Sequence, residues 1–388
     1  MKIAYFSHSS ISPSETFIYD LVKGLDSCEE IDLTYIGGQS KLLNEFHNIK
    51  CIATGYSDKF EKIAIYIKKI GQIIGGKGEN WKMRFTQIIS FRQLNEARLP
   101  KFDIAFVEYA TSGVLVMNYL EQQRLQFVVH VHGYDITAST NNKAYLSQLK
   151  ILFEKAIYFI VASQYMKRRL ILLGCDGKKI KLIYIGVESS EVKPLLWKEK
   201  IKGNPSIIFL GRLTNKKHPI ALLHAFKIVL DSIPNATLSI IGDGPMKNDV
   251  DEEIVRLDLI GKVKMLGVLL REQSFPIMNE HWIYAQHSVT GLNGDTEGFA
   301  ISLAEAALHG LPVVSTIHNG ITENVLDGKT GFLVPEYDYE SMAEKIIYLI
   351  QNPDIAEKMG KAGREQINSL CNPKQRVEKI IEILKTIK

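Results

Sequence analysis

The stretch of sequence that decides the fold runs from Ser206 to Pro219 and reads Ser-Ile-Ile-Phe-Leu-Gly-Arg-Leu-Thr-Asn-Lys-Lys-His-Pro. Its apolar, β-rich run ends at Gly211, and Pro219 opens an apolar segment of helical period, which is the order of a βα unit in a parallel sheet. Arg212 and Lys217 lie in the turn, beside the predicted helix N-terminus. Such a pair can neutralise a diphosphate without a metal ion, but a solvated basic loop has the same composition. The stretch therefore predicts a βα unit and leaves both interpretations of its charge open.

The same unit recurs on both sides of this stretch. Short β-rich runs alternate with longer segments of helical period. The predicted strands cover 3–7, 31–36, 104–108, 127–131, 158–162 and 181–185 in the first half, and 206–210, 237–241, 264–266, 282–286, 313–315 and 331–334 in the second. We therefore predict an α/β protein of two Rossmann-like, doubly wound domains, with a ligand cleft between the carboxyl ends of their sheets.

The domain boundary is expected in the linker 186–205, where Ser, Gly and Pro residues interrupt both periods. This gives a first domain over 1–195 and a second over 196–371. Val377, Ile380, Ile381 and Leu384 recur at helical spacing in the tail. The tail, 372–388, is therefore predicted to be an amphipathic helix that docks back on the first domain.

Length and composition limit the class of protein. The 388 residues are 46% hydrophobic and 23% charged, which excludes a single small module and a disordered chain. A net charge of +4 does not favour a dedicated nucleic-acid binder. Four scattered cysteines predict reduced thiols in a cytoplasmic protein. The start of the chain turns polar too soon for a signal peptide, and no run is long enough to span a membrane, so any membrane contact is expected to be peripheral.

A second group of polar residues begins at Glu297, just before a predicted helix that contains Glu305. The first-turn amides of that helix suit a phosphate or a sugar, and they are offered by Gly298, Phe299, Ala300 and Ile301. A diphosphate would repel both carboxylates, so we expect them to bind hydroxyl groups. An acid that complements the helix dipole explains Glu297 equally well, but it does not explain Glu305 within an apolar stretch.

Two weaker patterns also follow predicted strands. Gly242 and Gly244 allow a close backbone approach to a ligand, although an ordinary βα turn needs the same residues. His132 ends the strand 127–131 before Gly133 and is placed to face a substrate, although a lone histidine is more often structural. Nearby, Asp135 is expected to cap a turn or helix, and Ser14 to cap the first helix.

Together these residues resemble the retaining GT-B glycosyltransferases of family 4, also called glycosyltransferases group 1. The resemblance covers nearly the whole second half. In the first half it rests on His132-Gly133 and the two-domain layout, while the opening Ser14-Glu15-Thr16-Phe17 is similar to that of some exopolysaccharide-assembly transferases. The matching segments of the second half are Gly211-Arg212 with Lys217, Gly242-Asp243-Gly244-Pro245, Glu297-Gly298-Phe299-Ala300-Ile301 with Glu305, and His309-Gly310-Leu311-Pro312-Val313-Val314.

The resemblance implies transfer of a sugar from a nucleotide-diphosphate donor with retention of configuration and without a metal or other cofactor. Arg212 and Lys217 would bind the diphosphate, and Glu305 the ribose hydroxyls. Glu297 and the amides that follow it would hold the donor sugar, and His132 would lie beside the reacting carbon. A UDP-sugar is expected more than a GDP-sugar, with a saccharide or lipid-linked saccharide acceptor in cell-surface polysaccharide assembly and with no nucleic-acid partner.

The chain departs from the family pattern at two positions, and two other functions are also compatible with the sequence. The loop after the first strand is Ser-rich where many relatives carry two glycines, and Asn319-Gly320 has one glycine where relatives often have two. A GT-B nucleotide-sugar epimerase would not release nucleotide steadily to an acceptor. A non-catalytic nucleotide-sugar-binding subunit would bind the donor tightly without turnover.

The segment 59–92 is strongly basic. It carries eight Lys or Arg residues against two Glu, a local balance of 8 − 2 = +6, with apolar residues at helical spacing among them. This composition is typical of a surface drawn to anionic lipid, although a core-packing helix with a solvated basic face explains it equally well. We therefore expect peripheral contact with the inner face of the cytoplasmic membrane.

Overall fold

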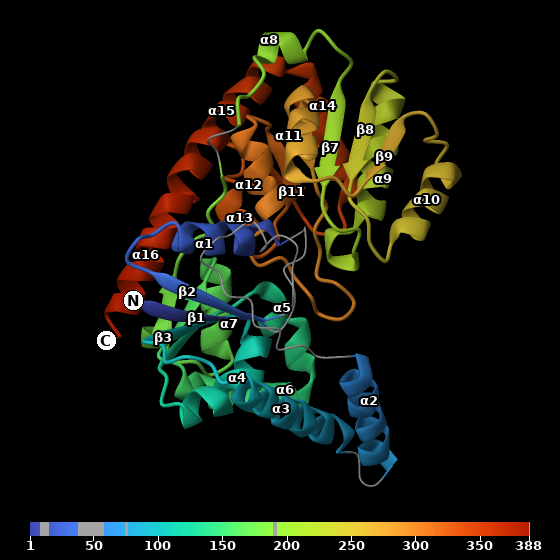
Figure 1. Ribbon diagram of the computed structural model, residues 1–388. Helices are drawn as coiled ribbons and strands as arrows, with labels where there is room; N and C mark the ends of the chain where they lie inside the picture. Colours follow the sequence, from blue (N-terminus) through green and yellow to red (C-terminus); the bar gives the residue numbers. More distant parts are fainter. Residues whose placement is uncertain (8–14, 38–57, 74–76, 189–191, 388) are drawn as a thin grey trace. The chain divides into compact units, whose positions relative to one another are not determined.

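The computed structural model describes residues 1–7, 15–37, 58–73, 77–188 and 192–387 (Figure 1). The chain divides into two compact units, which are described separately here. Unit 1 is Met1–Gly186 with Pro373–Lys388, and unit 2 is Val187–Asn372. Each unit holds one six-stranded parallel sheet, and all twelve predicted strands are present, with ends that differ by up to three residues.

The sheet of unit 1 has the strand order β2-β1-β3-β4-β5-β6. The chain adds β2 on one side of β1 and all later strands on the other, so the order reverses between β1 and β3. Ligands of doubly wound sheets bind at the carboxyl ends of the strands at such a reversal. The strands are β1 (Lys2–Ser7), β2 (Asp32–Gly37), β3 (Ile104–Glu108), β4 (Phe127–His130), β5 (Tyr158–Val161) and β6 (Ile180–Leu182).

The last helix of the chain, α16 (Pro373–Lys385), packs in unit 1 against α1 (Thr16–Asp26). Val377 and its helical neighbours Ile380, Ile381 and Leu384 are buried there. The fit is close, because a Cβ atom at Gly24 would lie 2.5 Å from Val377 Cγ2. Ser14, the predicted cap of the first helix, lies outside the described residues. Unit 1 also contains α4 (Ala110–Gln122), α5 (Gly133–Ile136), α6 (Lys143–Lys155) and α7 (Gln164–Leu172).

Helices α2 (Asp58–Ile73) and α3 (Gly78–Glu96) form a hairpin at the edge of unit 1 (Figure 1). Helix α3 packs against α4 and α6, whereas the main neighbour of α2 is α3. Among the described helices, none combines the length and apolar character needed to cross a bilayer. We call residues 58–96 the α2–α3 hairpin below.

The sheet of unit 2 has the order β12-β11-β10-β7-β8-β9, which reverses between β7 and β10. Its strands are β7 (Ser206–Leu210), β8 (Thr237–Ile241), β9 (Val263–Gly267), β10 (Ile283–Ala285), β11 (Val313–Thr316) and β12 (Gly331–Val334). The covering helices are α9 (Pro219–Ser232), α10 (Lys247–Arg256), α11 (Arg271–Glu280), α12 (Ile301–Leu308), α13 (Ile321–Asn324), α14 (Tyr339–Gln351) and α15 (Pro353–Leu370). Buried side chains such as Phe209, Phe226 and Ile346 form its core.

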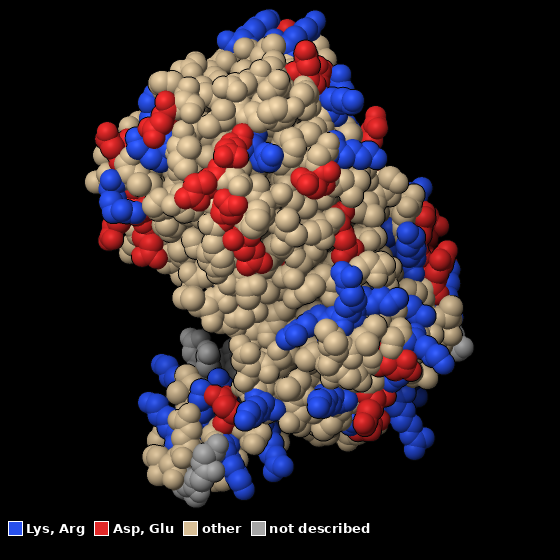
Figure 2. All heavy atoms as spheres, turned by 180° about the vertical axis from the view of Figure 1, so that it is seen from behind, with Lys and Arg blue, Asp and Glu red and all other residues tan. Residues whose placement is uncertain are grey.

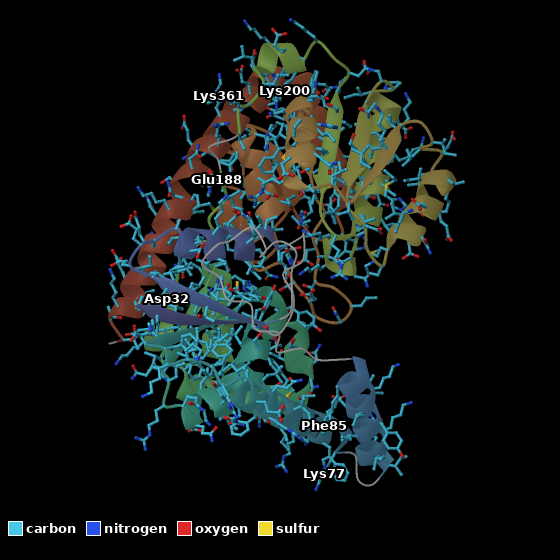
Figure 3. The ribbon with its side chains drawn as sticks, viewed as in Figure 1. Asp32, Lys77, Phe85, Glu188, Lys200 and Lys361 are labelled. Atoms are coloured by element: carbon cyan, nitrogen blue, oxygen red, sulfur yellow. The ribbon has the colours of Figure 1, made fainter. Side chains whose placement is uncertain are left out.

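The break between the units falls at Gly186–Val187, ahead of residue 195, because the chain from Val187 onward bonds to unit 2. The Val187 amide donates to Cys371 O at 2.8 Å, and the Val192 carbonyl accepts from Arg364 at 3.0 Å. A short helix, α8 (Trp197–Lys200), then brings Lys200, labelled in Figure 3, under the carbonyls of His281 and His309. Cys28, Cys175 and Cys371 form no disulfide among the described residues, and Cys51 lies outside them.

Candidate functional site

In unit 2 the charged residues of the two strongest sequence patterns meet at the reversal of strand order. Arg212 and Lys217 lie in the connection between β7 and α9, and Glu297 lies in the long connection between β10 and α12. Strands β7 and β10 are neighbours, so both connections leave the same edge of the sheet. The structure therefore brings together residues that are far apart in the sequence.

Glu297 and Lys217 form an ion pair in which both side chains are nearly buried. Lys217 Nζ lies 3.0 Å from Glu297 Oε1, and it also donates to Gln286 Oε1 at 3.3 Å. Burial alone would raise the pKa of Glu297, but the positive charges of Lys217 and Lys216 lower it to about 2. The carboxylate is therefore charged at neutral pH and cannot serve there as a proton donor.

Lys216 is a member of this cluster that the sequence analysis did not single out. Its Nζ lies 3.2 Å from Asp295 Oδ2. Burial lowers the pKa of Lys216, but the carboxylates of Glu297 and Asp295 raise it further, so the side chain stays cationic. The only signal in the sequence was its position next to Lys217.

Arg212 differs from both lysines because it is exposed. Within the described part of the chain its guanidinium has no ion pair. It lies in the connection after β7, and planar guanidinium donors can make two parallel bonds to a phosphate.

Gly242 and Gly244 let the connections after β7 and β8 pack backbone to backbone. A Cβ atom at Gly242 would lie 2.0 Å from Gly211 O, and one at Gly244 would lie 2.4 Å from Leu213 O. Gly242 also has a φ of +140°, which a side chain would disfavour. These glycines allow close packing against the loop that carries Arg212, so their role in this structure is to support that loop.

Helix α12 begins at the site with a strained residue. Ala300, its N-cap residue, has a φ of +59°, in the left-handed region that costs a residue with a Cβ atom roughly 1 to 2 kcal/mol. No described side chain caps the helix, which begins at Ile301, so Gly298, Phe299 and Ala300 precede its first turn instead of forming it as predicted. Glu305 is buried on α12, with Oε1 at 3.7 Å from Arg271 Nη2.

The segment after β11 stabilises the connection between β10 and α12. The Glu297 amide donates to His318 Nε2 at 3.1 Å, and His318 Nδ1 lies 2.6 Å from Glu336 Oε1. The Asn324 side chain donates to the carbonyls of Phe299 and Ala300. These bonds fix the backbone that positions Glu297 and the start of α12.

The same segment explains one departure from the family pattern. Asn319 has a φ of +43°, and asparagine is one of the few non-glycine residues that adopt this conformation readily. Gly320 has an ordinary φ of −70° but lies so close to Gly298 that a Cβ atom would come within 1.8 Å of Gly298 O. Asn319 therefore adopts a dihedral angle that also suits glycine, while Gly320 is needed for space.

In unit 1, His132 follows β4 at the carboxyl edge of the sheet. Its ring packs near the rings of Phe17 and Tyr109, with centroid distances of 4.9 and 4.4 Å. Tyr109 has a φ of +69°, a strained conformation of the kind that is often found at functional sites. The hydroxyl of Tyr109 donates to Glu15.

Asp135 is a cap, as predicted. Its Oδ2 accepts bonds of 2.9 Å from the amides of His132 and Ala110, and its Oδ1 accepts a bond of 3.3 Å from the Thr111 amide. Burial raises the pKa of Asp135, although these amides oppose the shift. Asp135 thus ties the backbone of His132 to the start of α4.

Both halves of the chain match families of known proteins. Residues 193–366 match the family model "Glycosyl transferases group 1", and residues 15–191 match "Glycosyltransferase Family 4". The amylovoran biosynthesis glycosyltransferase AmsK of Erwinia amylovora is 28% identical over 287 residues, which cover 74% of this chain and 70% of that protein. The putative colanic acid biosynthesis glycosyltransferase WcaL of Escherichia coli K12 is 28% identical over 269 residues, or 68% and 66% of the two chains.

The fold is shared with a solved structure. The crystal structure of Anabaena Alr3699/HepE in complex with UDP and glucose has a TM-score of 0.78 over 99% of both chains, at 20% identity. Two Rossmann-like parallel sheets and this similarity define a GT-B protein. The chain belongs to the glycosyltransferases, with a family 4 first half and a group 1 second half.

Proposed function

We propose that the enzyme transfers a sugar from a UDP-sugar to a saccharide acceptor during the assembly of a cell-surface polysaccharide, with retention of configuration. The observation that carries the donor assignment is the cluster of Arg212, Lys216, Lys217 and Glu297 at the strand reversal of unit 2. The relatives named for amylovoran and colanic acid biosynthesis support a role in polysaccharide assembly. The UDP complex of the Anabaena protein supports UDP as the nucleotide of the donor.

The donor diphosphate would bind between the exposed guanidinium of Arg212 and the ammonium group of Lys217. The backbone amides that lead into α12, from Gly298 to Ile301, would add donors from the other side of the strand reversal. Lys217 and Glu297 neutralise each other in this structure. When the donor binds, Lys217 gains a phosphate and Glu297 gains sugar hydroxyls, so neither charge is left unpaired.

Glu305 would bind the ribose, because its carboxylate is buried on α12, the helix that follows the connection containing Glu297. His132 would act from unit 1 beside the reacting carbon. In a retaining transfer of this kind the bond from the anomeric carbon to the phosphate oxygen breaks and the acceptor oxygen bonds to that carbon on the same face. The proton of the acceptor hydroxyl passes to the departing phosphate oxygen, whose developing charge Arg212 and Lys217 stabilise.

We expect transfer to survive chelation. Two cations and a helix N-terminus already oppose the diphosphate charge, so a divalent metal ion is not needed for it. Transfer from a UDP-sugar should continue at an unchanged rate in excess EDTA, and NMR of the first product should show the anomeric configuration of the donor. Activity that disappears with EDTA and returns with manganese would refute metal independence, and an inverted product would refute retention.

We further propose that the α2–α3 hairpin contacts anionic lipid, where a lipid-linked acceptor would be presented. Large apolar side chains of the hairpin face outward, with Tyr66 65% exposed, Ile73 84% and Ile88 63%. Exposed lysines and arginines lie among them, and Figure 2 shows these cations gathered over the hairpin. Lys77, at the start of α3, and the partly buried Phe85 are labelled in Figure 3.

Lys68 is less suited to this role, because it forms an ion pair with Glu79 within the hairpin. Each basic residue close to an anionic surface contributes about 1 kcal/mol. Changing the exposed Lys69, Lys77 and Arg84 to Glu should therefore lower partition onto phosphatidylserine vesicles at low salt by at least about 100-fold.

The control for this experiment changes Lys193, Lys198 and Lys361 to Glu. These lysines are exposed in unit 2, so the total charge changes equally while the hairpin stays intact. UDP affinity should be unaffected in both triple variants. Equal loss of vesicle binding in the two variants, or no binding by the wild type, would leave a soluble acceptor as the better proposal.

A further inference from the structure

Unit 1 contains a buried carboxylate that the proposed function does not use. Glu108 is the last residue of β3 and is 0% exposed. Its Oε1 accepts a hydrogen bond from His132 Nε2 and lies 2.9 Å from His130 Nδ1. Its Oε2 accepts a hydrogen bond from the hydroxyl of Tyr5. A charge this deeply buried is costly unless its partners compensate for it.

The electrostatics of the cluster assign its protons. Burial would raise the pKa of Glu108, but the two histidines hold that pKa well below its usual range, so the group is a carboxylate. Burial and Glu108 together raise the pKa of Tyr5, which keeps its hydroxyl proton. A carboxylate only accepts hydrogen bonds, so the His132 nitrogen that faces it must carry a proton. Nε2 is therefore the protonated nitrogen of His132.

Two imidazoles and one carboxylate can also bind a metal ion, and their ligand atoms lie within 4.8 Å of one another. The spacing does not favour that alternative. Ligand atoms around a tetrahedral zinc ion, with bonds of about 2.0 to 2.1 Å, lie about 3.3 Å apart. His130 Nδ1 is only 2.9 Å from Glu108 Oε1, and His132 Nε2 is closer still. The cluster has the dimensions of a hydrogen-bonded group.

The register of the sheet explains why these residues meet. Glu108 pairs with His130 across β3 and β4, and Tyr5 lies on β1, the other neighbour of β3. His132 follows two residues after His130, so both rings lie on the same side of the strand. Three adjacent strands thus converge on one carboxylate at the strand reversal of unit 1.

We propose that Glu108 is a positioning residue for His132. This proposal rests on the role proposed above for His132. Glu108 accepts a hydrogen bond from Nε2 of the ring and so fixes the tautomer in which Nε2 carries the proton. The Phe17 and Tyr109 rings also pack near this ring. A ring fixed at Nε2 presents its remaining edge to the donor sugar in one orientation, and small errors in such an orientation slow a reaction strongly.

The first test is long-range ¹⁵N–¹H NMR of the full chain with ¹⁵N-labelled histidine. The chain has ten histidines, and the signal that is lost in His132→Ala assigns His132. We expect Nε2 of His132 to be protonated in the wild type at neutral pH. An Nε2 without a proton overturns the proposal, whether or not Glu108→Gln folds and whether or not transfer is detected.

The second test separates turnover from donor binding. Glu108→Gln keeps the shape of the side chain but removes its charge, and its amide can turn either a donor or an acceptor toward the histidines. We expect a mixture of His132 tautomers, a fall in kcat of more than about 10-fold, and a donor KM within about 2-fold of the wild type. Tyr5→Phe, which removes one bond to the other oxygen, should have a smaller effect in the same direction.

Glu121→Gln is the matched control, because Glu121 is exposed on α4 and pairs with Lys155. It should change neither the NMR signal nor kcat. If Glu108→Gln lowers only thermal stability and keeps the wild-type kcat, Glu108 is structural and the proposal fails. Stoichiometric zinc in the purified protein that is lost in His130→Ala would also overturn it. If His132→Ala transfers normally, the role proposed for His132 fails instead.

Discussion

Replacing Arg212 with alanine should lower kcat/KM for transfer by roughly 2 to 4 kcal/mol in transition-state terms, or about 30- to 900-fold. The guanidinium is the exposed cation at the strand reversal of unit 2, and its planar donors suit the charge that develops on a departing diphosphate. Because Arg212 has no ion pair within the described residues, the free energy of unfolding should stay within about 0.5 kcal/mol of the wild-type value. UDP affinity should fall, while uridine affinity should change less.

Lys217→Ala should cause a similar loss of transfer together with a loss of stability. The substitution leaves the buried Glu297 carboxylate with Lys216 as its remaining cation, and breaking a buried ion pair costs about 3 to 5 kcal/mol. Adding Glu297→Gln to Lys217→Ala should restore thermal stability without restoring transfer. This pair of results would distinguish the ligand role of Lys217 from its structural role.

The control is Lys227→Ala, which removes an exposed lysine that pairs with Asp231 on the surface of α9. It should change neither stability nor kinetics, since exposed ion pairs contribute little. Wild-type kinetics for both Arg212→Ala and Lys217→Ala would rule out the diphosphate assignment.

The second large effect is expected for Gly320→Ala. The new Cβ atom would come within 1.8 Å of Gly298 O and 2.6 Å of Gly298 C, and both are backbone atoms that cannot rotate away. This steric clash can be relieved only if the connection that carries Glu297 and the start of α12 moves. We expect a loss of roughly 1 to 3 kcal/mol or more in the free energy of unfolding, measured by urea denaturation, and transfer that is hardly detectable.

Gly203→Ala is the matched control in the same unit. Its nearest neighbour would be Lys200 O at 3.7 Å, an ordinary contact, and its φ is not in the left-handed region. This variant should unfold like the wild type and transfer normally. Equal stability of the two alanine variants would show that the contact between Gly320 and Gly298 can relax and that the 318–320 segment does not support the site.

The sequence could predict the strands because most of them are covered on both faces, so each appears as an unbroken apolar run between turn residues. It could also predict that Arg212, Lys217 and Glu297 lie at the strand ends, because parallel strands place their following loops on one edge. The pairing of Lys217 with Glu297 was not predictable, since it depends on β7 and β10 being neighbours.

The cluster around Glu108 shows the same limit. The only signal in the sequence was a charged residue at the end of the apolar strand Ile104–Glu108. Its contact with His130 and His132 depends on the register between β3 and β4, and its contact with Tyr5 depends on the position of β1 beside β3. Register and strand order are properties of the folded sheet, so neither partner could be named from the local pattern.

The position of α16 affects how the protein folds as it is synthesised. Unit 1 is built from two stretches of chain, and all of Val187–Asn372 is made between them. At about 5 to 20 residues per second, the ribosome needs roughly 10 to 40 s to make that insertion. During this interval the surface of α1 that Val377 and Leu384 later cover stays open, and at its end unit 2 has its whole sequence. The unit begun first is therefore the one completed last, and a nascent chain that has emerged only as far as Asn372 would carry a complete unit 2 and an incomplete unit 1.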